Sequence, residues 1–186
     1  TMYLIRHGES LGQAAKSLGL DRKRSPALTD AGLTVKGQRQ ASQIAGIMGG
    51  PEAAMVDLVV TSPLTRAMHT ALLGFGEIEE APVIVDYDIR EIGSRLPENV
   101  GRDVRAVLRD LRAGEGFLGR LDYETRKPEG WPGEGGEGEG KREGRAERVR
   151  GVMRDIAGME EISVVAVVCH HNVIQSILGP GVKPKN

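Results

Sequence analysis

Cysteine is nearly absent from the sequence: among 186 residues only Cys169 occurs. A lone cysteine excludes a disulfide framework within the chain and is typical of proteins from reducing compartments. No apolar run reaches about 18 residues, so the sequence predicts no membrane-spanning helix. No signal-peptide pattern precedes the first apolar segment, and we therefore expect a cytoplasmic location.

An excess of charge of one sign is also lacking. Lys plus Arg number 25 and Asp plus Glu number 26. This balance indicates neither a nucleic-acid partner nor a membrane partner. Aromatic residues make up only 3 %, so the core must be built from aliphatic side chains. The length and the ordinary apolar content predict one domain over residues 1–186.

Short β-branched segments alternate with segments of helical spacing. This alternation predicts an α/β fold with a mostly parallel sheet. The predicted strands are residues 2–6, 57–61, 83–85 and 163–168. The predicted helices are residues 34–48, 63–73, 103–111, 141–157 and 173–178, with Pro63 in the first turn of the second.

A glycine- and glutamate-rich segment, residues 131–144, interrupts this pattern. Glycine has the largest backbone entropy to lose, and neighbouring glutamates repel one another. We expect a flexible surface loop here, and a mobile lid over an active site is the alternative interpretation.

Reactive side chains follow three of the predicted strands. The first strand ends in Arg6-His7-Gly8-Glu9-Ser10, and the second leads into Ser62-Pro63-Leu64-Thr65-Arg66. The most hydrophobic strand ends in Cys169-His170-His171. Because α/β proteins bind ligands at the carboxyl ends of their strands, these groups are expected to form one site.

Two arginines and two histidines suit a phosphate monoester. Guanidinium groups offer a fixed fork of donors to phosphate oxygens, and an imidazole with a free ring nitrogen can attack phosphorus. The leaving oxygen then needs a proton, for which Glu91, just past the third strand, is the best candidate.

Five blocks, in order, resemble the histidine phosphatase superfamily, which includes cofactor-dependent phosphoglycerate mutase. The first is Arg6-His7-Gly8-Glu9-Ser10, and the others lie at residues 33–41, 61–71, 89–93 and 167–171. The resemblance implies a phosphoglycerate mutase-like fold, a three-layer α/β/α sandwich, without a metal or other cofactor.

The resemblance also implies a role for each matching residue. His7 would form a phosphohistidine, while Arg6, Arg66 and His170 would surround the phosphate. Glu91 would be the general acid and then the base for the attacking water. His170 is favoured over His171 because the family usually has glycine after its histidine.

Some positions depart from the family pattern or keep two interpretations. Gln13 stands where asparagine is common and is a possible phosphate ligand. Glu9 and Ser10 could contact the site or cap the turn, and His69 is expected to have a solvent or packing role. Adjacent His170 and His171 cannot easily converge on one ion, and nearby guanidiniums oppose a cation, so a zinc site is not expected.

The favoured function is a metal-independent phosphomonoesterase acting on a small phosphorylated metabolite or a phosphoprotein. A phosphoglycerate or phosphosugar mutase and a non-catalytic phospho-ligand-binding module are the alternatives. Four arginines could favour a second acidic group on the substrate, or could simply be solvated: Arg22, Arg24, Arg95 and Arg102.

Overall fold

The computed structural model describes residues 1–48, 55–91, 96–129, 131, 142–179 and 181. Within these residues, five strands form one sheet in the order β1-β5-β2-β3-β4, and every neighbouring pair is parallel. The strands are β1 (Met2–Arg6), β2 (Leu58–Thr61), β3 (Val83–Val85), β4 (Leu121–Asp122) and β5 (Val165–Cys169).

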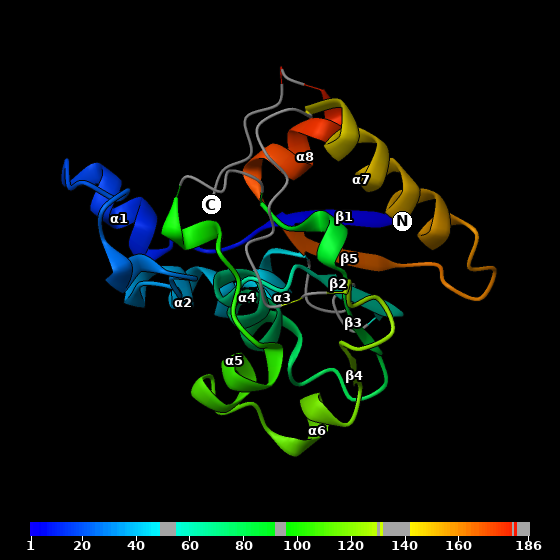
Figure 1. Cartoon of the computed structure of the whole chain (residues 1–186). Coiled ribbons are helices and arrows are strands. Elements are labelled where there is room, and N and C mark those ends of the chain that lie inside the picture. The colour runs from blue at the N-terminus through cyan, green and yellow to red at the C-terminus, as the bar shows by residue number, and fades with distance from the viewer. Residues whose placement is uncertain (49–54, 92–95, 130, 132–141, 180, 182–186) are drawn as a thin grey trace.

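Helices cover both faces of the sheet (Figure 1). One face packs against α2 (Val35–Ser42), α3 (Ile44–Ile47), α4 (Thr65–Phe75), α5 (Val104–Asp110) and α6 (Glu115–Leu118). The other packs against α7 (Arg142–Ala157) and α8 (His171–Leu178), while the 3₁₀ helix Tyr87–Ile89 contributes Tyr87 to the first core and Ile89 to the second. The helix α1 (Leu11–Ser17) and the 3₁₀ helices Pro26–Leu28 and Pro97–Asn99 lie in the connections.

Successive side chains of the central strands point to opposite faces of the sheet, so a separate hydrophobic core forms on each face. In β5, Ala166 and Val168 face the α4 side, whereas Val165, Val167 and Cys169 face the α7 side. All five side chains are buried, as expected for a parallel sheet that is covered on both faces. The predicted α/β fold with a mostly parallel sheet between helical layers is confirmed.

Two helix predictions are wrong in detail. The predicted helix 34–48 is divided at Gln43 into α2 and α3. Pro63 precedes α4 instead of lying in its first turn, because the helix begins at Thr65. The buried Asp30 side chain accepts the Thr65 N–H at 2.9 Å and so supplies the cap that fixes this start.

The predicted loop 131–144 lies mostly outside the described residues. Its last three residues, 142–144, lie in the first turn of α7, in agreement with the overlapping helix prediction 141–157. At its other end, the Trp131 ring packs edge-on against Tyr87, with ring centroids 5.0 Å apart. The ring also lies against Gly101, where a Cβ atom would come within 2.3 Å of it.

Within the described ranges, no helix combines the length and the apolar character needed to cross a bilayer.

Candidate active site

Adjacent strand ends bring the predicted residues together. Arg6 is in register with Cys169, and the His7 N–H continues this ladder to the Cys169 carbonyl at 3.1 Å. On the other side of β5, the Ser62 N–H donates to the Val168 carbonyl at 3.1 Å. The residues that follow β1, β5 and β2 therefore meet at one edge of the sheet.

The turn after β1 is held tightly by helix α2. A Cβ atom on Gly8 would lie 2.3 Å from the Gly37 carbonyl oxygen, and one on Gly37 would lie 2.1 Å from the Glu9 carbonyl oxygen. Only glycine at both positions allows the two backbones to approach this closely. The Gly8 N–H also donates to Thr70 Oγ1 on α4 at 3.1 Å, so α2 and α4 both fix the position of His7.

The hydrogen bonds of His7 define its tautomer. A guanidinium nitrogen can only donate, so the contact from Arg66 Nε to His7 Nε2 at 3.2 Å places a lone pair on Nε2. The proton therefore lies on Nδ1, which donates to the Gly8 carbonyl at 2.7 Å. The nitrogen that faces the arginine is the one with an electron pair available.

The surroundings also keep this imidazole neutral. His7 is 5 % exposed. Burial lowers the pKa of His7 well below its usual value, and the charges of Arg66 and Arg6 lower it further, although the Gly8 hydrogen bond opposes them. A neutral ring with its lone pair on Nε2 has the properties that a nucleophile needs.

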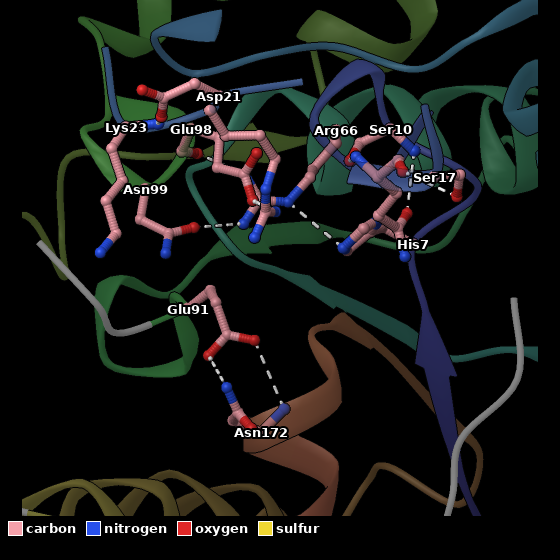
Figure 2. Close-up of polar contacts among 12 residues, drawn as sticks. His7, Ser10, Ser17, Asp21, Lys23, Arg66, Glu91, Glu98, Asn99 and Asn172 are labelled. Carbon is pink, nitrogen blue, oxygen red and sulfur yellow. Dashed lines mark hydrogen bonds and ion pairs between the residues drawn. The ribbon is translucent and has the colours of Figure 1, made fainter. Parts of the chain in front are cut away.

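Arg66 is buried on α4, and each of its nitrogens has a partner. Besides the bond to His7, one terminal nitrogen donates to the Glu98 carbonyl and the other to Asn99 Oδ1 at 2.8 Å (Figure 2). Burial lowers the pKa of Arg66, while Glu91, Asp30 and Glu98 raise it. The turn 97–99 therefore orients the guanidinium toward His7.

The second histidine lies directly beside the first. The rings of His7 and His170 have centroids 5.1 Å apart. His170 is fully buried, and its Nε2 lies 2.8 Å from Ser62 Oγ. Its Nδ1 has no hydrogen-bond partner among the described residues. Burial lowers the pKa of His170 well below its usual value, and the charges of Arg66, His7 and Arg6 act in the same direction.

Arg6 and Glu91 are the other predicted residues that border this site. Arg6 ends β1 and is half-buried, which lowers its pKa, whereas the charge of Glu91 raises it. Glu91 follows the 3₁₀ helix after β3, and in Figure 2 it lies between Arg66 and Asn172. Asn172 Nδ2 donates to Glu91 Oε1 at 3.0 Å. The electrostatic contacts of Glu91 with both arginines indicate that it borders the same site.

Gln13, Ser10 and Glu9 have structural partners. Ser10 caps α1, and its backbone N–H donates to Gln13 Oε1 at 2.9 Å, which forms a capping box. Glu9 accepts from Thr34 Oγ1 at 3.0 Å and pairs with Lys36 at 2.9 Å. The amide oxygen of Gln13 is thus used for capping, and a phosphate contact through its NH₂ group stays a prediction.

The other two histidines, His69 and His171, lie on helices. His69 is half-buried on α4, and burial lowers its pKa. His171 is half-buried in the first turn of α8 and not at the strand end itself. No group of three or more His, Cys, Asp or Glu residues able to hold a metal ion occurs in the described part of the chain.

Three of the four outlying arginines have acidic partners. Arg22 pairs with Glu98 at 2.7 Å, Arg24 lies 3.9 Å from Asp21, and Arg102 pairs with Asp110 at 2.8 Å. Arg95 lies outside the described residues. The pairs of Arg22 and Arg102 favour a structural role over recognition of a second acidic group, and Arg24 is a solvated surface charge.

Sequence reasoning missed several residues that organise the site. Ser62 and Thr70 lie within the second arginine block, but the strand-and-helix pattern assigned them no contact. Asn99 and Asn172 belong to separate turns, and only the folded chain brings them to Arg66 and Glu91. The missed signal for Asn172 was its position two residues after His170, at a helix start.

The site combines imidazole and guanidinium groups at the carboxyl edge of a parallel sheet, an arrangement that suits phosphoryl transfer. The chain belongs to the histidine phosphatase superfamily (branch 1), whose family model matches residues 2–181. This membership confirms the family predicted from the five sequence blocks and supports the predicted phosphatase class.

Solved structures show the same fold. A mutant phosphoserine phosphatase from Entamoeba histolytica in complex with phosphoserine is 25% identical, with a TM-score of 0.56 and coverage of 96% of this chain and 78% of that one. YhfR from Bacillus stearothermophilus is 21% identical, with a TM-score of 0.59 and coverage of 95% and 77%.

A third structure, the α-ribazole phosphatase from Shigella flexneri, is 22% identical, with a TM-score of 0.54 and coverage of 95% and 77%. A comparison with curated proteins finds no match.

Proposed function

We propose that the chain is a metal-independent phosphomonoesterase that forms a phosphohistidine at His7. The observation that carries the proposal is the tautomer of His7, with its Nδ1 proton bound by Gly8 and its Nε2 lone pair facing Arg66. Such an imidazole can form a bond to phosphorus without first losing a proton. The same lone pair that accepts from Arg66 points toward the guanidinium groups that would hold a phosphate.

The groups around His7 would hold the phosphate. Arg66 would exchange its bond to Nε2 for one to a phosphate oxygen, and Arg6 would supply a second guanidinium. The buried Nδ1 of His170 lacks a partner among the described residues, and once protonated it would donate to the bound anion. Phosphate dianions favour this protonation because opposite charges stabilise each other in a buried site.

Glu91 would manage the proton in both steps. In the first, His7 Nε2 bonds to phosphorus, the ester P–O bond breaks, and the leaving oxygen takes a proton from Glu91. In the second, Glu91 takes a proton from water as the water oxygen bonds to phosphorus and the N–P bond breaks. Positive charge already surrounds the phosphate, so these steps need no metal ion to neutralise it.

The substrate class is proposed as a small phosphorylated metabolite or a phosphoprotein. The similar phosphoserine phosphatase was solved with phosphoserine, which is a small phosphomonoester. That likeness supports a phosphomonoester bond as the bond that is cleaved. The rest of the substrate would contact the connections around residues 11–32 and 96–100.

Hydrolysis assays test the proposal. The substrates are p-nitrophenyl phosphate and a panel of phosphorylated metabolites, each with and without EDTA. We expect activity that EDTA leaves intact, and an acid-labile phosphoryl group on His7 after rapid quenching. His7→Ala should abolish both, whereas His69→Ala should retain both. Absence of turnover by the folded protein, or full activity of His7→Ala, would refute the assignment.

A further inference from the structure

We propose that Asn172 is a positioning residue that determines which oxygen of Glu91 delivers the proton. This inference rests on the proposed function, because it assigns Asn172 a task only if Glu91 is the general acid. Asn172 is not among the residues that the sequence blocks assign to the site.

Two donors from Asn172 hold the Glu91 carboxylate. The side-chain Nδ2 donates to Oε1 at 3.0 Å, and the backbone N–H lies 3.4 Å from Oε2 (Figure 2). The shorter contact has ordinary hydrogen-bond length, whereas the second is long and weak. The two oxygens of Glu91 are therefore not equivalent.

This asymmetry determines where a proton resides. An amide N–H prefers the carbonyl-type oxygen of a carboxylic acid, because the hydroxyl oxygen is the poorer acceptor. The bond from Asn172 Nδ2 thus keeps Oε1 as the acceptor and leaves the proton on Oε2. When the ester bond breaks, Oε2 gives this proton to the leaving oxygen, and Oε1 stays bound to the amide.

The same helix end positions the second histidine. His170 is the residue before α8, its side chain does not cap the helix, and its ring is fixed by Ser62 at 2.8 Å. The backbone N–H of Asn172, in the first turn, is then one of the helix donors that need an outside acceptor. Glu91 Oε2, 3.4 Å away, is only a weak acceptor for it and so stays able to carry the proton, while the buried Val173 and Ile174 hold the helix in place.

The exposure of Asn172 distinguishes a positioning role from a role in stabilising the fold. Asn172 is exposed, so its side chain contributes little to the core. Substitution by alanine should shift the melting temperature by less than about 2 °C, because substitutions of exposed side chains usually change stability little.

The test compares two leaving groups. A simple alkyl phosphate needs a proton on its leaving oxygen, whereas p-nitrophenolate leaves without one. The value of kcat/KM covers only the steps up to phosphoryl transfer to His7, so the later attack of water does not enter. Asn172→Ala should lower kcat/KM by about 10-fold or more on the alkyl phosphate, the range for supporting partners. On p-nitrophenyl phosphate it should stay within about twofold of the wild type.

A double variant gives the decisive comparison. Glu91→Gln should reduce kcat/KM on the alkyl phosphate by about 10²-fold or more. Adding Asn172→Ala to Glu91→Gln should cause no further loss if Asn172 acts through Glu91. Ser176→Ala, which removes a hydroxyl bonded to the Asn172 carbonyl at 2.8 Å, is the matched control on the same helix and should resemble the wild type.

Each outcome has a distinct meaning. Equal losses on both substrates, or additive losses in the double variant, would overturn the proposal, because they would show that Asn172 binds the phosphate itself. Unchanged activity of Asn172→Ala on both substrates would overturn it as well. A wild-type protein that hydrolyses neither ester would instead refute the proposed function.

Discussion

The two buried histidines should make the protein sensitive to moderate acid. Burial and the arginine charges lower the pKa of His7 and of His170 well below the value of 6.5 that is usual for histidine. In the unfolded chain both rings regain an ordinary pKa. Between pH 6.5 and their folded-state pKa values the unfolded state therefore binds more protons, and the free energy of unfolding falls as the pH falls.

The size of the effect follows from linkage. Each histidine that is neutral when folded and charged when unfolded makes the free energy of unfolding fall by about 1.4 kcal/mol per pH unit. His7→Gln removes one such group, so the loss per pH unit below 6.5 should be about 1.4 kcal/mol smaller in the variant than in the wild type. Above pH 7 the two profiles should run parallel, because both rings are then neutral in both states.

Urea unfolding measures the difference in stability between wild type and His7→Gln across the titration range of histidine. The unfolding is followed by far-ultraviolet circular dichroism at constant ionic strength, from about pH 8 to pH 5. His69→Gln is the matched control. Its imidazole is half-buried and has only burial to lower its pKa, so its substitution should change the slope less. If the difference between wild type and His7→Gln stays constant with pH, the argument that the fold holds His7 neutral is refuted.

Three further substitutions test other parts of the site. Arg66→Lys should lower kcat/KM by about 10²-fold, because an ammonium group cannot reproduce three directed donors, and steady-state kinetics with a melting curve separates this from unfolding. Gly37→Ala would place a Cβ 2.1 Å from the Glu9 carbonyl oxygen and should destabilise the fold by about 1–3 kcal/mol, as measured by urea unfolding. Asp30→Asn weakens the cap on Thr65 and should cost about 1 kcal/mol, whereas a stability equal to the wild type would contradict the capping role.

The sheet could be predicted because its signals are local. Four strands are short apolar runs, three of them rich in β-branched residues, and the structure places them within about two residues of the predicted bounds. The fifth, Leu121–Asp122, could not be found, since two half-buried residues at a sheet edge carry no periodicity. The start of α4 was misplaced because its cap comes from Asp30, which is distant in the sequence.

Part of the candidate site could be predicted because its side chains directly follow the strands. His7, Arg6 and His170 follow buried strands directly, so their proximity follows from a parallel sheet. The orientation of each group was not predictable. The tautomer of His7 depends on Arg66, and the direction of the Glu91 carboxylate depends on Asn172, which is 81 residues away in the sequence.

Cys169 lies at the end of β5, fully buried beside His170. Burial raises the pKa of its thiol to about 12. Because the thiolate is the reactive form, the thiol should resist alkylating reagents and peroxide while the protein is folded. The rate at which a maleimide labels Cys169 therefore reports how often the sheet opens at the edge that holds the two imidazoles.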